Sequence, residues 1–125
     1  MATRCNVIVK DSCSEFVLYR HSDGYPSGTL PTLRMFLDRV ADGSIRDNVE
    51  QAVGWLIFIS HAEYFAGSSF KDAWKVGAYK PSIGIHGDIK YLYEIDLDKK
   101  SIECWHHNGR KKLGQVDLTS SNPDA

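Results

Sequence analysis

The chain has 125 residues, of which 42% are hydrophobic and 25% are charged, so it fits one ordinary globular domain with little room for a second. Its 15 basic and 16 acidic side chains give a formal net charge of -1. That balance argues against a dedicated nucleic-acid coat protein, which would carry a basic excess. Nucleic acid is therefore not favoured as a partner, although a local basic patch is compatible with these numbers.

The cysteines and apolar runs bear on the cellular compartment. The chain has an odd number of cysteines, Cys5, Cys13 and Cys104, and no two of them form a C-x-x-C pair. This pattern is typical of reduced thiols and not of a zinc site. The longest apolar run, residues 52–59, is too short to span a bilayer. The N-terminus leads directly into a strand-like segment and not a signal peptide. We expect a soluble cytoplasmic protein with no membrane partner, no metal and no cofactor.

The N-terminal segment predicts a β-hairpin. Residues 5–10 and 16–20 alternate in polarity and are rich in β-branched and aromatic residues, which favours two strands. Residues 11–14, Asp-Ser-Cys-Ser, have the chemistry of a turn.

Two helices are predicted next. Apolar residues recur at helical spacing between Leu33 and Val40, with Thr29 or Leu30 preceding the first turn and Pro31 near its start. Gly43 is a natural C-terminal stop. A second helix is expected from about Asp47 to Ala66.

The second helix carries two open questions. Its cap is either the pair Ser44 and Asp47 or the pair Asp47 and Glu50. Its apolar residues lie nearly all round, which predicts a buried central helix. On composition alone, residues 54–59 are also compatible with a buried strand. The helix-forming continuation, residues 61–66, favours the helix.

The C-terminal third predicts an antiparallel meander. Residues 74–80 form a strand stopped by Pro81, and residues 89–97 alternate most clearly. Strands at residues 101–107 and 111–118 follow, joined by an Asn108-Gly109 turn, and residues 119–125 form a flexible tail. The sum is a single α+β domain over residues 1–118: an N-terminal β-hairpin, two helices on one face and a C-terminal antiparallel meander (ββααβββ).

The most informative stretch is "YRHSDGYPSG", residues 19–28, between the second strand and the first helix. Asp23-Gly24 is a turn dipeptide in which glycine supplies positive φ, and Pro26 forces Tyr25 to be extended. A turn alone does not need Arg20 or His21. Three interpretations stay open: a turn only, a contact with a ligand or partner, or a catalytic site.

A second stretch, "GIHGD" at residues 84–88, repeats that chemistry with His86 and Asp88. If the fold brings the two loops together, His21, Asp23, His86 and Asp88 form either a metal or acid–base set or a network of turn caps. We assign no catalytic residue and no metal ligand. The hypothesis is a binding surface made of six residues: Arg20, His21, Asp23, Tyr25, His86 and Asp88.

A third pattern interleaves lysines with aromatic residues between positions 71 and 93. Such a stripe either stacks a nucleotide or is a half-buried sheet with extended lysines, and the second interpretation is favoured. Its members are Lys71, Trp74, Lys75, Tyr79, Lys80, Lys90, Tyr91 and Tyr93.

The segments "VLYRHSDGYPSGTLPTL", "GWLIFI" and "WKVGAYKPSIGIHGDIKYLYEIDL" together resemble a family of small proteins encoded by phages and prophages. The shared features are a strand ending in Y-R-H-x-D-G-Y-P and a later H-G-D before a Y-x-Y-x-I strand, across roughly residues 4–105. The resemblance carries no assigned chemistry. It implies a small accessory phage protein, of a kind that often inhibits host defence.

The expected function is therefore non-enzymatic binding, either of a host protein or of a small nucleotide-like signal, in the host cytoplasm. The alternative is a small hydrolase or nuclease that uses His21, Asp23, His86 and Asp88. We also expect a homodimer, because the chain is rich in apolar aromatics and its edge strands need cover.

Overall fold

The computed structural model describes residues 3–67, 79–106 and 111–117. Its elements, in chain order, are β1 (Cys5–Lys10), β2 (Glu15–Arg20), α1 (Pro26–Ala41), α2 (Val49–Gly67), β3 (Lys80–Pro81), β4 (Tyr91–Asp96), β5 (Ser101–His106) and β6 (Lys111–Asp117). The predicted α+β class, with a hairpin, two helices and a C-terminal meander, is confirmed. The Asn108-Gly109 turn and the tail at 119–125 lie outside the described residues.

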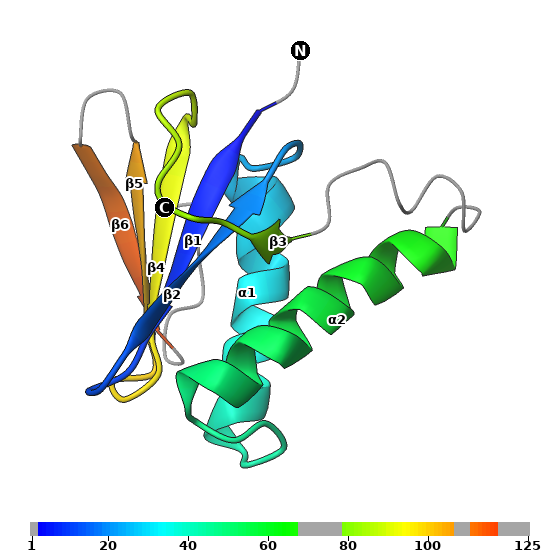
Figure 1. Ribbon diagram of the computed structural model, residues 1–125, viewed down its shortest axis with the longest axis vertical. Helices are drawn as coiled ribbons and strands as arrows, with labels where there is room; N and C mark the ends of the chain where they lie inside the picture. The colour runs from blue at the N-terminus through cyan, green and yellow to red at the C-terminus, as the bar shows by residue number, and fades with distance from the viewer. Residues whose placement is uncertain (1–2, 68–78, 107–110, 118–125) are drawn as a thin grey trace.

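One six-stranded sheet, in the order β3-β2-β1-β4-β5-β6, forms the frame of the molecule. Figure 1 shows both helices on the same side of this sheet. All neighbouring strands are antiparallel except β1 and β4, which are parallel. This parallel pair departs from the fully antiparallel prediction, because the chain passes through both helices before β4 returns beside β1.

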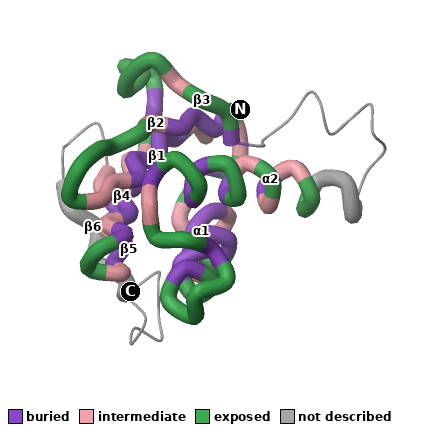
Figure 2. The backbone as a smooth tube through the Cα atoms, turned by 60° about the horizontal axis from the view of Figure 1, so that its bottom comes forward, coloured by how far each residue is buried: buried purple, intermediate pink, exposed green. Residues whose placement is uncertain are grey.

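The core lies between the helices and the inner face of the sheet. Alternate residues of the strands point inward there, and Figure 2 shows buried backbone concentrated in the central strands and α1. The fully buried side chains of this layer include Val7, Val9, Leu18, Leu33, Phe36, Leu37, Leu56, Tyr93, Ile95 and Ile102.

Helix α1 begins earlier than the sequence predicted. Tyr25 is its extended N-cap residue and Pro26 is its first residue, so Pro31 lies inside the helix. Proline fits the first position because its φ is already helical. At Pro31 the missing N–H removes a helical hydrogen bond to the carbonyl four residues earlier. The predicted end is right, since Gly43 has a φ of 87° directly after the last turn.

Helix α2 includes the ambiguous residues 54–59, so the helical interpretation is confirmed. Neither predicted cap is used. The side-chain oxygen of Asn48 accepts a hydrogen bond from the backbone N–H of Gln51 at 2.9 Å, as an N-cap does. The helix is not buried all round either: Trp55 and Phe58 are 50% and 60% exposed.

Strand β3 is placed differently from the prediction. Residues 74–78 of the predicted strand lie outside the described residues, and Pro81 belongs to the strand instead of stopping it. β3 pairs with β2, with Tyr19 opposite Lys80, at the sheet edge away from the meander. Proline is tolerated there because an edge strand has one side without ladder partners.

Candidate functional site

The candidate site is the loop at residues 82–90, which crosses the outer face of the sheet. β3 lies beside β2, whereas β4 lies on the far side of β1, so the connection must pass over both hairpin strands. Three backbone N–H groups attach it to the hairpin. Ser82 donates to the carbonyl of Val17, and Lys90 donates to the carbonyl of Arg4, each at 2.9 Å. Between them, His86 donates to Asn6 Oδ1 at 2.8 Å.

Asn6 is the buried support of this loop. It is fully buried in β1, on the face opposite Cys5 and Val7, which join the core. Its Nδ2 donates to the carbonyl of Leu18 at 2.8 Å while its Oδ1 holds His86. A buried amide with both ends bonded fixes two segments against each other. No sequence signal marks Asn6 as a functional residue, since polar residues on an outer strand face are ordinarily solvated.

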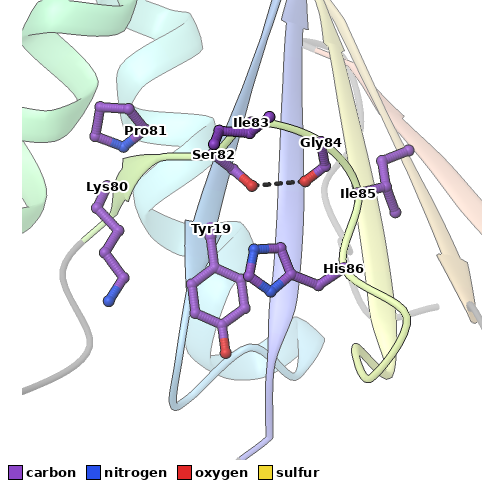
Figure 3. A pocket seen from close by; sticks show the side chains of 8 residues that line it. All are labelled: Tyr19, Lys80, Pro81, Ser82, Ile83, Gly84, Ile85 and His86. Atoms are coloured by element: carbon purple, nitrogen blue, oxygen red, sulfur yellow. Dashed lines mark hydrogen bonds between the residues drawn. The ribbon is translucent and has the colours of Figure 1, made fainter.

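Tyr19 and His86 form the floor of the site. Their side chains lie together beneath the loop in Figure 3, and the rings stack with centroids 4.1 Å apart and planes at 15°. The ammonium of Lys80 lies 5.5 Å from the centroid of the Tyr19 ring. Tyr19 is only 6% exposed, and burial is the main reason that its pKa is raised. The stack holds the His86 ring in one orientation.

Arg4 links the two predicted loops. Its Nε donates to His21 Nδ1 at 3.4 Å and lies 3.6 Å from a carboxylate oxygen of Asp88. The Tyr19 hydroxyl also shares a hydrogen bond with His21 Nδ1 at 3.0 Å, and Asp88 lies 4.0 Å from His86 Nδ1. Three of the four predicted His and Asp residues are thus brought together around Tyr19 and Arg4.

Asp23, the fourth, serves the start of α1. Its carbonyl accepts a hydrogen bond from the Thr29 hydroxyl at 2.9 Å, and its carboxylate accepts one from the Tyr25 hydroxyl at 3.4 Å. Tyr25 itself is 40% exposed. Within the described ranges, no three His, Cys, Asp or Glu side chains are grouped so that they could hold a metal ion. The proposed four-residue metal set is therefore not formed here.

Arg20 points inward, unlike its predicted role on the binding surface. The residue is 7% exposed, and its guanidinium donates to the carbonyl of Gly28 at 3.1 Å and to Thr29 Oγ1 at 3.3 Å. The same group lies 5.2 Å from the centroid of the Tyr79 ring. Arg20 thereby attaches the first turn of α1 to the sheet.

Gly24 is required for space, not for its φ. The positive φ of the turn belongs to Asp23, at 59°. A Cβ on Gly24 would lie 2.9 Å from both Thr3 O and Cys5 Cβ. Its N–H donates to Thr3 O at 2.9 Å, and its carbonyl accepts from the buried Tyr93 hydroxyl at 2.6 Å. The predicted backbone constraint is thus real, but its cause is close packing.

The buried thiol of Cys5, beside this turn, is unreactive at neutral pH. Cys5 is fully buried and free, and burial raises its pKa to about 12. The thiol therefore stays protonated at neutral pH, whereas a reactive cysteine needs its thiolate.

An open groove of about 430 Å³ runs along the crossing loop, lined by Tyr19 and by residues 80–86. Ile83 is fully exposed in the loop, and Ile85 is 47% exposed. The Ser82 hydroxyl donates to the carbonyl of Gly84 at 2.6 Å and closes the turn between them (Figure 3). The sequence signal for this surface was present: two isoleucines flank a glycine between Pro81 and Gly87.

The lysine–aromatic stripe does not form one surface. Tyr79 and Tyr93 are fully buried, and the half-buried Tyr91 packs edge-on against His106 with ring centroids 5.4 Å apart. Lys71, Trp74 and Lys75 lie outside the described residues. Tyr91 and Tyr93 lie in β4, as the favoured sheet interpretation predicts, whereas Tyr79 lies in the core just before β3.

Comparison with known proteins adds no relative. No family model matches the chain, and neither a curated protein nor a solved structure matches it. Among the helices that the structure describes, none has both the length and the apolar character needed to cross a membrane.

Proposed function

We propose that this chain is a small phage-type accessory protein that binds a host protein without catalysis and thereby inhibits a host defence system. The recognition element is residues 82–87 of the crossing loop. The observation that carries the proposal is the full exposure of Ile83 and the half exposure of Ile85, on a loop anchored at both flanks and in its middle.

Exposed isoleucines on an anchored loop suit protein recognition. Burying one isoleucine side chain is worth about 1.5–3 kcal/mol, so two can supply a large part of an interface's free energy. The hydrogen bonds from Ser82, His86 and Lys90 already order the loop, which lowers the entropy lost on binding.

The charges around the loop favour an acidic rim on the partner. Lys80 and Lys90 are exposed next to it, and Arg4 is partly exposed beneath it. Asp88 lies near Arg4 and offsets only part of this positive charge. Complementary charge at the rim speeds association and selects the orientation of the partner.

A small hydrolase or nuclease is the second candidate. The observation in its favour is the convergence of His21, His86 and Asp88 beside the open groove. In such an enzyme, His86 and Asp88 would close from 4.0 Å to hydrogen-bond distance in the substrate complex.

The proposal is tested by affinity capture from host-cell lysate with the tagged full chain, followed by mass spectrometry of bound proteins and small molecules. The test variant is Ile83→Glu, and the matched control is Met35→Glu on α1, where Met35 is 38% exposed. We expect one host protein to be captured by the wild type and by Met35→Glu but lost with Ile83→Glu.

Two other outcomes would overturn the proposal. Capture that survives Ile83→Glu would remove the loop from the interface, and recovery of a nucleotide instead of a protein would assign the site to a signal molecule. Turnover of nucleic acid or nucleotides that is abolished by His86→Gln but unaffected by Ile83→Glu would establish the enzymatic alternative.

A further inference from the structure

A second exposed apolar surface lies on α2, whose inner face packs against the core. Trp55 and Phe58 are 50% and 60% exposed, and their rings meet edge to face with centroids 5.8 Å apart. They line an open hollow of about 440 Å³ together with Glu50, Gln51 and Gly54. We call this surface the α2 aromatic face.

Gly54 makes no close contact that would require glycine within the part of the chain that the structure describes. A glycine in the middle of a helix is destabilising by about 1 kcal/mol relative to alanine. Apart from its chain neighbours and the backbone of its own helix, no described atom lies within 4 Å of where a Cβ on Gly54 would stand. Packing among the described residues therefore does not require glycine here. Its effect is to leave a depression in the helix surface directly beside two large exposed rings.

We propose that the α2 aromatic face binds a second copy of this chain, with the two α2 helices antiparallel about a twofold axis. Phe58 of each copy then fills the depression over Gly54 of the other. In antiparallel helices a step forward along one is a step back along the other. Pairing Gly54 with Phe58 therefore places Glu50 opposite Ala62 and Gln51 opposite His61.

This register matches small residues with large ones at two positions of the face. Small residues, Gly54 and Ala62, stand opposite the larger Phe58 and Glu50, and glycine lets helix backbones approach closely. The partly exposed His61 comes within about one turn of Glu50 on the other copy, which supplies a polar or charged contact. Because the protrusion and the depression lie on the same face, a twofold contact satisfies both at once. This self-complementarity favours a second copy over a different partner.

The dimer should be weak and reversible. A half-exposed aromatic side chain offers roughly 100 Å². The four rings of two copies together offer about 400 Å², well below the roughly 1,200 Å² of a stable interface. A contact of this size predicts association only at high protein concentration.

Sedimentation velocity of the full chain at concentrations from micromolar to millimolar tests the proposal. The wild type should move from the monomer mass of 14.1 kDa towards twice that value. Gly54→Leu fills the depression with a better helix former and should raise the dimer Kd at least roughly tenfold. A thermal melt showing that Gly54→Leu is folded excludes unfolding as the cause.

A swap variant makes the test specific. Gly54→Phe alone places two phenylalanines opposite each other and should weaken the dimer, whereas Gly54→Phe combined with Phe58→Gly exchanges protrusion and depression and should restore it. A wild type that stays monomeric throughout, or a dimer that survives both Gly54→Leu and Phe58→Lys, overturns the proposal. Monomers whose Phe58 is needed instead to bind lipid vesicles or another protein overturn it too. Ile83→Glu should leave the mass unchanged, which separates this inference from the proposed function.

Discussion

The two faces of the sheet are covered by different means, although the same strands supply both. The inner face packs apolar side chains against two helices, whereas the outer face carries the crossing loop, which is attached by polar contacts. The Tyr19–Arg20 pair shows the difference most directly. Tyr19 points outward to stack on His86, and Arg20 points inward to bind the first turn of α1. Strand alternation thus divides one chemically rich motif into a structural half and a surface half.

The helix-covered side of the sheet should be more sensitive to added side-chain volume than the loop-covered side. Gly24→Val should lower the free energy of unfolding by about 2–3 kcal/mol, because its side chain would collide with Thr3 O and Cys5 Cβ. Urea unfolding measures this change. Gly84→Val is the matched control on the loop, where a Cβ meets no described atom within 4 Å, and should change stability by less than ~0.5 kcal/mol. Equal losses at the two glycines would contradict the contrast between the faces.

The crossing loop on the outer face should depend on hydrogen bonds for its stability, and less on packing. Asn6→Leu removes the acceptor of the His86 N–H and the donor to Leu18 O, so stability should fall by about 2 kcal/mol. The loss should be local as well: hydrogen exchange at the His86 amide should accelerate more than exchange in β4. If exchange at His86 is unchanged, Asn6 does not hold the loop.

The exposed hydrogen bonds that Asp11 accepts should contribute least to the stability of the fold. Asp11 joins the hairpin turn to α2, accepting from the N–H groups of Cys13 and Ser14 at 2.8 Å and of Val49 at 3.1 Å. These three bonds hold the pKa of Asp11 below its usual 3.8. The stabilisation is present above that value and is lost as the pH falls through the lower, folded-state pKa.

The stability difference between wild type and Asp11→Ala should therefore shrink as the pH falls from about 6 to about 2, as followed by urea unfolding. A constant difference across that range would show that the charge of Asp11 plays no part. At neutral pH the effect should be smaller than that of Asn6→Leu, because water competes for exposed hydrogen bonds.

Local patterns were enough to predict most of the elements. Alternation predicted β1, β2, β4 and β5, and helical spacing predicted both helices, because each signal is carried by neighbours along the chain. The start of α1 was wrong because both Pro26 and Pro31 suit a first turn, and the sequence does not say which is used. The cap of α2 was wrong because Ser44, Asp47 and Asn48 are all capping residues within one short segment.

The sequence by itself determined the α+β class, the hairpin, the order of the elements and the two loops that hold His21 and His86, since composition and periodicity are local properties. Only the tertiary structure decided that β3 lies at the far edge and sends residues 82–90 across the outer face. That crossing stacks His86 on Tyr19, buries Asn6 and leaves Ile83 in solvent. Which strand neighbours which is fixed by packing between residues distant in sequence, and no local pattern encodes it.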